Sequence, residues 1–105
     1  MSKKQTAGRD HLGEFAPKFA ELNDDVLFGQ VWSREEELSP KLRSIVTVSV
    51  LMTAGNFEQL EHHLAFAKSN GVTKEEIAEI ITHAAFYMGW PKAWSAFAKA
   101  KEIWK

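Results

Sequence analysis

The stretch TKEEIAEIITHAAFYM, residues 73–88, decides the fold class of this 105-residue chain. It begins with a capping box, in which the Thr73 side chain and the Glu76 side chain three residues later satisfy free amides at a helix start. Six apolar residues then recur with the period of one helix face: Ile77, Ile80, Ile81, Ala84, Ala85 and Met88. The pattern predicts an amphipathic helix with one buried side.

Turn residues on both sides of this helix mark its neighbours. Gly89-Trp90-Pro91 ends it and starts a last helix, because glycine stops a helix and proline fits the first position of a new one. Upstream, Asn56 and Gln59 form a capping-box-like pair for a helix that runs to Asn70-Gly71. The last helix carries an apolar stripe made of Ala93, Phe97, Ala100 and Trp104.

The segment from Ser39-Pro40 to Ala54 is rich in β-branched residues and locally resembles a strand. Its sixteen residues contain no turn signal, and they start with a serine cap and a first-position proline. Length therefore favours a buried helix.

The N-terminal third predicts shorter elements. Residues 1–10 are polar and are expected to form a flexible arm. Apolar residues from His11 to Trp32 recur at helical spacing, with an interruption at Asn23-Asp24-Asp25, which predicts two short helices. No long linker follows. We therefore expect residues 11–105 to form a single all-α domain with four main helices after the short N-terminal ones.

Composition excludes several function classes. The formal net charge of −1 provides no field for nucleic acid or an anionic membrane, so we expect neither as a partner. No apolar run approaches the ~20 residues of a membrane-spanning helix, and the polar start predicts a cytoplasmic protein. The absence of cysteine excludes thiol catalysis, thiolate metal sites and disulfides within this chain.

The aromatic content is high for one small domain. Four Trp, seven Phe and one Tyr predict that some large side chains face another subunit of a homo-oligomer. A single dense core with a few aromatics left at the surface is the alternative.

Helix-face arithmetic separates the histidines. At 100° per residue, His63 lies on the flank of the face formed by Leu60 and Leu64, whereas His62 points outward. His83 occupies a similar flank of the next helix, four residues before Tyr87. Such half-sheltered histidines serve either as hydrogen-bonded packing residues or as acid-base groups. Adjacent histidines project about 100° apart and no H-x-x-x-H pair exists, so no metal site is expected.

Arg43 lies in the first turns of an otherwise apolar helix. Its guanidinium can bind a carboxylate through two parallel hydrogen bonds, or it can form a structural ion pair with one of the glutamates at 35–37 or with a neighbouring subunit. Trp32, just before those glutamates, either walls a pocket or packs.

Several segments match a known family: Gln30–Ser33, Leu38–Val48, His63-Leu64, Asn70–Ile77 and Tyr87–Ala93. On these residues the chain resembles the carboxymuconolactone decarboxylase family of the AhpD-like superfamily, from about Phe15 to Trp104. The resemblance implies an AhpD-like helical fold and a ring-shaped homo-oligomer, a hexamer or a trimer. It also places Asn56 and Gln59 where AhpD peroxidases carry cysteines, so peroxidase activity is not expected.

The decarboxylase branch keeps one histidine, at the position of His63. The resemblance therefore implies a cofactor-independent lyase acting on a small lactone acid of aromatic catabolism. His63 is then the proton donor or oxyanion stabiliser and Arg43 binds a carboxylate. Trp32, His83 and Tyr87 are expected to contact the substrate, although His83 replaces the glutamine usual in these decarboxylases. The alternatives are an oligomeric protein that binds small molecules without catalysis and a redox accessory protein that uses a partner's thiols.

Overall fold

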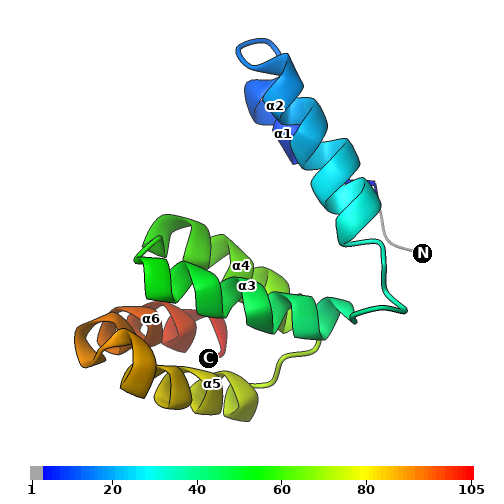
Figure 1. Ribbon diagram of the computed structural model, residues 1–105. Helices are drawn as coiled ribbons and strands as arrows, with labels where there is room; N and C mark the ends of the chain where they lie inside the picture. The colour runs from blue at the N-terminus through cyan, green and yellow to red at the C-terminus, as the bar shows by residue number, and fades with distance from the viewer. Residues whose placement is uncertain (1–3) are drawn as a thin grey trace. The chain divides into compact units, whose positions relative to one another are not determined.

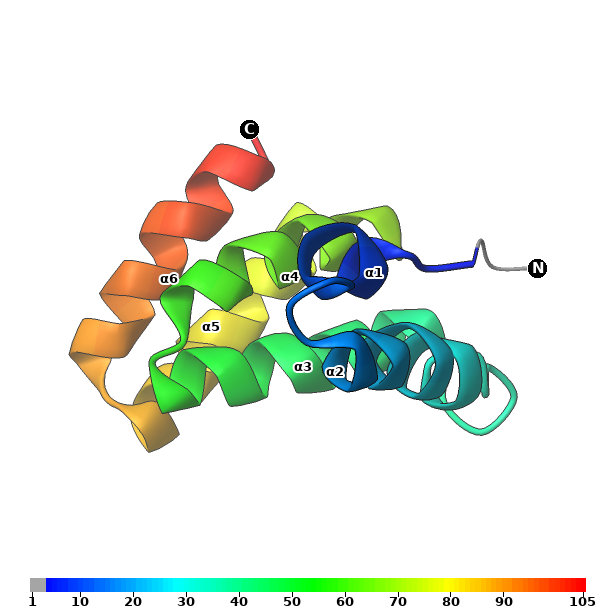
Figure 2. The ribbon, with the colours of Figure 1, turned by 90° about the horizontal axis from the view of Figure 1, so that it is seen from above.

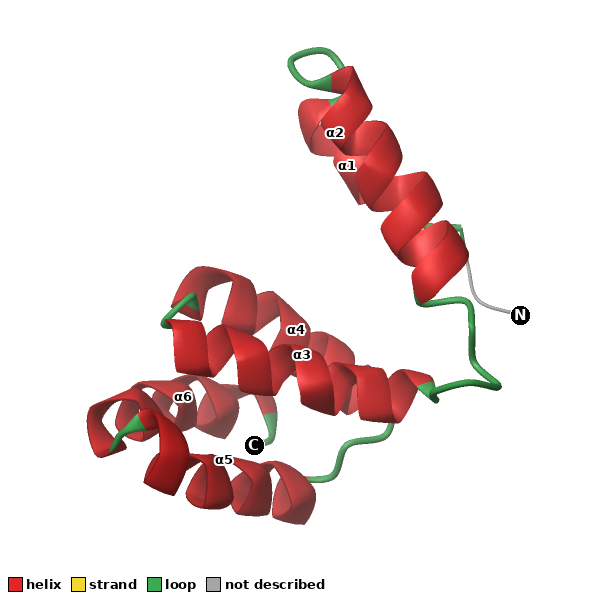
Figure 3. Cartoon of the chain, viewed as in Figure 1, coloured by secondary structure: helices red, strands yellow, loops and turns green. Residues whose placement is uncertain are grey.

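The computed structural model describes residues 4–105, which form two compact units, one ending at Ser39 and the other spanning Pro40–Lys105. Helices joined by turns make up both units, and no strand occurs in the part of the chain that is described (Figure 1, Figure 3). The all-α prediction is therefore confirmed. None of the helices within residues 4–105 combines the length and apolarity that crossing a bilayer requires.

The first unit contains helix α1 (Ala7–Leu12), helix α2 (Pro17–Glu21) and a π-helical segment, η1 (Leu22–Val31). Two sequence predictions differ from this arrangement. The arm expected over residues 1–10 already becomes helical at Ala7, and its residues 1–3 lie outside the described part. The prediction that Asn23-Asp24-Asp25 interrupts the helix is also wrong, because α2 continues directly into η1, which contains these residues.

Asp24 explains why a helix runs through this polar stretch. Its buried carboxylate accepts hydrogen bonds from the backbone amides of Gly8 at 2.8 Å and Arg9 at 3.0 Å, which are free donors near the start of α1. The Arg9 guanidinium also pairs with Asp25 at 2.8 Å. Burial opposes ionisation of Asp24, but hydrogen bonds from Asn23, Arg9 and Gly8 and the Arg9 charge outweigh it, so the pKa of Asp24 is lowered.

We expect acid to loosen α1 through Asp24. A carboxyl group whose pKa is lowered by folding stabilises the fold above its unfolded pKa of about 4 and loses that contribution as the pH falls toward the folded value. Amide hydrogen exchange should show protection of Gly8 and Arg9 falling below about pH 4. Asp24→Asn should reduce this protection already at neutral pH, whereas Asp10→Asn, at an exposed position, should retain the wild-type profile.

The second unit consists of α3 (Pro40–Ala54), α4 (Phe57–Ser69), α5 (Lys74–Met88) and α6 (Trp90–Ile103). Helix α3 packs on α4 and α5, and α6 packs on the same two helices and also contacts α3, whereas α4 and α5 make no contact with each other among the described residues. Figure 2 shows the four helices from above. Side chains from all four helices form the core, and its fully buried members are Val48, Met52, Leu60, Leu64, Ala67, Ile81 and Ala96.

The predicted helix boundaries hold in this unit. Gly55, Gly71 and Gly89 have φ of 79°, 99° and 104°, a left-handed region that favours glycine and ends the preceding helices. The capping box is formed, because Glu76 N donates to Thr73 Oγ1 at 3.1 Å and Thr73 N donates to Glu76 Oε1 at 2.9 Å. The capping-box-like pair expected between Asn56 and Gln59 is not formed. Asn56 is the N-cap of α4, but its side chain makes no capping hydrogen bond.

Candidate functional site

Helix α3 presents different chemistry on its two flanks. Its centre line, Ser44, Val48 and Met52, is buried in the core. Ile45 and Ser49 line a cavity against α5, which identifies the flank on that side. Because successive residues are rotated by 100°, Arg43 and Thr47 lie on the other flank, toward α4.

A hydrogen bond fixes how α3 and α4 face each other. Asn70 Nδ2, at the end of α4, donates to the buried Ser44 Oγ at 2.9 Å. His63 lies seven residues before Asn70, which is two turns along the same flank of α4. The opposite flank of α4 faces α6, since Glu61 pairs with Lys99 at 3.6 Å. His63 is therefore on the α3 side.

Helix geometry thus puts Arg43 and His63 along the line where α3 and α4 pack on each other, which we call the α3–α4 seam: Arg43 and Thr47 on α3, and His63, Phe66 and Asn70 on α4. Arg43 adjoins Ser44 at the Asn70 end. With a rise of 1.5 Å per residue, His63 lies roughly 10 Å further along the seam. By this geometry the two predicted site residues lie on the same side of the bundle, about two helical turns apart.

The His63 side chain is half-buried, and its Nδ1 atom is buried. Its ring makes an edge contact with Phe66, with centroids 6.2 Å apart. Burial lowers the pKa of His63, and the positive charge of neighbouring His62 lowers it further. The imidazole is consequently neutral at neutral pH, so that it can donate a proton in a hydrogen bond without carrying charge.

His83 and Tyr87 occupy a different place. Their rings lie 5.3 Å apart on the flank of α5 that faces α3, on the side of α3 away from the seam. They line a cavity of about 620 Å³, which we call the α3–α5 cavity, whose lining is Ile45, Ser49, Glu76, Glu79, Ile80, His83, Ala84 and Tyr87. The expected likeness between His83 and His63 is not observed, because His83 is exposed and His63 is half-buried.

The remaining predicted contact, Trp32, belongs to the first unit, where its ring stacks on Phe28 with centroids 5.9 Å apart. Among residues 4–105, no three His, Asp or Glu side chains are grouped closely enough to hold a metal ion.

Sequence reasoning missed two features of these sites. The Asn70–Ser44 bond joins positions 26 residues apart, and Asn70 was interpreted only as a helix stop. The lining of the α3–α5 cavity does have a sequence pattern, because Ile45 and Ser49 are four residues apart and so lie on one side of α3. The corresponding series on α5, Glu79, His83 and Tyr87, also has this spacing.

Comparison with known proteins places this geometry in context. A sequence model of the carboxymuconolactone decarboxylase family matches residues 17–102. A 4-carboxymuconolactone decarboxylase of Acinetobacter baylyi is 36% identical over 96 residues, which cover 91% of this chain and 71% of that protein. Nitrosuccinic acid decarboxylase npaB of Metarhizium robertsii is 38% identical over 71 residues, which cover 68% of this chain and 49% of that protein.

Proposed function

Because the chain belongs to the carboxymuconolactone decarboxylase family, we propose that it removes carbon dioxide from a small unsaturated lactone acid without a cofactor. The substrate is 4-carboxymuconolactone or a close analogue. The observation that carries the proposal is the half-buried imidazole of His63, whose pKa is lowered, and helix geometry adds the guanidinium of Arg43 along the same seam. The names of both relatives describe decarboxylation of an organic acid, which supports the reaction class.

The substrate can supply its own electron acceptor. When the bond to the departing carboxylate breaks, its electron pair moves through the ring double bond to the lactone carbonyl oxygen. Carbon dioxide leaves and a dienolate remains, which must then gain a proton on carbon. The protein has to stabilise the developing oxyanion, provide that proton and keep water from the departing carboxylate.

His63 suits the first two tasks. A neutral imidazole donates a hydrogen bond to the oxyanion; after carbon dioxide has left, it takes up a proton from solvent and gives one to the carbon, so the ring is neutral before and after the step. Phe66, whose ring contacts His63, provides apolar surface beside it.

Arg43 binds the carboxylate that is retained. A bidentate guanidinium-carboxylate pair fixes both the position and the orientation of a small acid. Helix rise puts the two positions roughly 10 Å apart along the seam, a separation that a small acid and the long arginine side chain can span together.

Arg43→Gln should raise KM about 10- to 100-fold, because a hydrogen-bonded charged contact is lost, and should change kcat less. Lys41→Gln is the matched control. It removes one positive charge from the same helix end but disrupts only the exposed Lys41–Glu76 pair at 2.9 Å. Steady-state kinetics with the lactone measures both constants. Equal KM values for the two variants would remove Arg43 from substrate binding.

The proposed activity is tested directly by adding purified protein to 4-carboxymuconolactone and following loss of its ultraviolet absorbance together with release of carbon dioxide. A parallel reaction with nitrosuccinate tests the chemistry named for the second relative, since a nitro group can also accept the electron pair. Turnover of either acid supports a decarboxylase. Absence of turnover with both would contradict it.

A non-catalytic binding protein is the second candidate, and the α3–α5 cavity favours it. Its aliphatic walls and the paired rings of His83 and Tyr87 form a site separate from the seam. On this alternative, ligands alter the Tyr87 signals in NMR spectra without being consumed. A redox accessory role would require thiols from a partner, because the chain has no cysteine.

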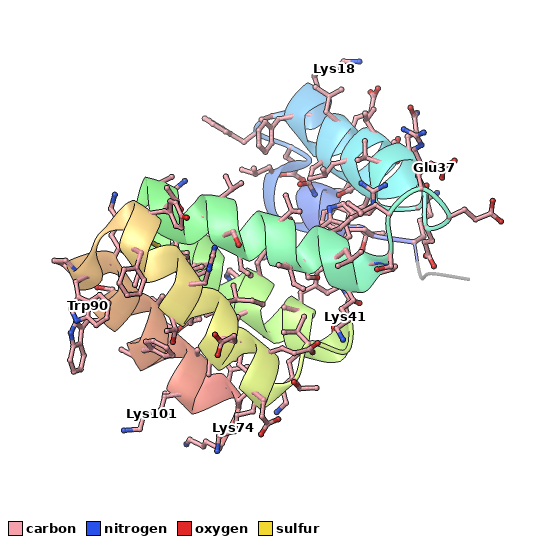
Figure 4. The ribbon with its side chains drawn as sticks, turned by 60° about the horizontal axis from the view of Figure 1, so that its bottom comes forward. Lys18, Glu37, Lys41, Lys74, Trp90 and Lys101 are labelled. Atoms are coloured by element: carbon pink, nitrogen blue, oxygen red, sulfur yellow. The ribbon has the colours of Figure 1, made fainter. Side chains whose placement is uncertain are left out.

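We also propose a homo-oligomer, either a hexamer or a trimer. Large apolar side chains are exposed at the α5–α6 end of the second unit, where Trp94 is 70% and Phe86 77% exposed. Trp90, the first residue of α6, extends outward at the same end (Figure 4). Exposed aromatic clusters of this kind are typical of subunit interfaces, which supports association through this end.

A further inference from the structure

A cavity of about 450 Å³ lies between the start of α5 and the end of α6. Because α3 pairs with α4 and α5 with α6, this cavity is on the far side of the bundle from the α3–α4 seam. It shares no lining residue with the α3–α5 cavity. We call it the α5–α6 pocket. Its floor is apolar and consists of Ile77, Phe97 and Trp104, and its rim consists of Lys74, Lys101 and Lys105.

The floor is rigid and apolar. Ile77 and Trp104 are almost fully buried, and the Trp104 indole N–H donates to the Val72 carbonyl oxygen at 3.0 Å. That bond occupies the polar atom of the indole and holds its ring in place. A ligand entering the pocket therefore meets aromatic and aliphatic surface, which favours a flat apolar group.

The rim is basic. Lys74 begins α5, Lys101 lies near the end of α6, and Figure 4 shows both side chains at the same edge of the bundle. Lys105 is paired with Glu102 at 3.1 Å. Within residues 4–105 no ion pair involves Lys74 or Lys101, and no acidic side chain lines the pocket.

We propose that the α5–α6 pocket binds an amphipathic organic anion, an aromatic carboxylate whose rings enter the pocket while the carboxylate lies between Lys74 and Lys101. Burying the rings removes apolar surface from water. The two ammonium groups provide the charge that an anion needs at the rim and disfavour an amine. The volume suits a ligand of one or two rings.

The test uses 2-naphthoate with the full-length chain, followed by NMR of the Trp104 indole N–H signal. Titration should move this signal with a Kd of about 1 mM or lower, as expected for a fragment of this size. The neutral analogue 2-naphthalenemethanol should bind more weakly and 2-naphthylmethylamine weakest of the three. An amine that binds as well as the carboxylate would overturn the proposal.

Variants separate the charge contribution from the apolar one. The double variant Lys74→Gln, Lys101→Gln should weaken naphthoate binding about tenfold and leave binding of the neutral analogue unchanged. Lys99→Gln is the matched control, because Lys99 lies on the same helix but faces Glu61 on α4. Equal loss in the double variant and the control would overturn the assignment. Since binding is measured without turnover, the result is independent of the proposed decarboxylation.

Discussion

Replacing His63 with alanine is expected to lower kcat for decarboxylation about 1000-fold, which is close to 4 kcal/mol of transition-state stabilisation. The loss should be this large because one imidazole both stabilises the oxyanion and provides the proton. The fold should survive, since His63 lies on the flank of α4 while the buried face is formed by Leu60, Leu64 and Ala67. Circular dichroism and single-turnover kinetics on the same sample measure both outcomes.

His62→Ala is the control for this prediction. His62 is exposed on the neighbouring position, so its loss should leave kcat near the wild-type value at neutral pH. Because the His62 charge helps to lower the pKa of His63, removing it should raise that pKa. As the pH falls, His63 then becomes protonated at a higher pH than in the wild type. The acid limb of the plot of rate against pH should therefore shift to higher pH. Similar kcat losses in both variants would argue against a specific role for His63.

The second large effect concerns stability. Leu64 is fully buried at the centre of the core, beside His63 in sequence. Leu64→Ala should lower the free energy of unfolding by about 3 kcal/mol, because it removes buried apolar surface and leaves a cavity. For a domain of this size the melting temperature should fall by more than about 10 °C. Urea unfolding followed by far-ultraviolet circular dichroism measures the change.

Val50→Ala provides the comparison. Val50 lies on the outer face of α3 and is 59% exposed, so the substitution should change the unfolding free energy by less than about 0.5 kcal/mol. A loss at Leu64 no larger than that at Val50 would contradict the core described above. If Leu64→Ala also reduces kcat while the protein remains folded, α4 packing positions His63.

The second unit was predictable because its signals are local. The Thr73–Glu76 capping box and the glycine stops at 55, 71 and 89 act over a few residues, and the apolar period shows which face is buried. The first unit was not predictable in this way, because the contact that determines its structure joins residues far apart in the sequence. Asp24 lies in a polar run that usually breaks a helix, and only its bonds to Gly8 and Arg9 make that run helical.

The same distinction applies to the site. Residue chemistry indicated His63 and Arg43, and helix-face arithmetic placed His63 on a flank. It could not determine which neighbouring helix packs on which flank. That information comes from contacts between helices, such as Asn70 with Ser44, and it separates His83 and Tyr87 from His63. Sequence alone had grouped all of them around one substrate.

If Arg43 and His63 hold the two ends of the ligand, the positions of these residues along the antiparallel helices α3 and α4 set the length of the ligand that binds. A basic residue four positions later on α3, in place of Thr47, would stand about 6 Å closer to the imidazole. Members of the family with such an exchange would then select shorter diacids while keeping the same scaffold. Selectivity among these proteins would then diverge through the position of one charge along a helix, with the reaction chemistry unchanged.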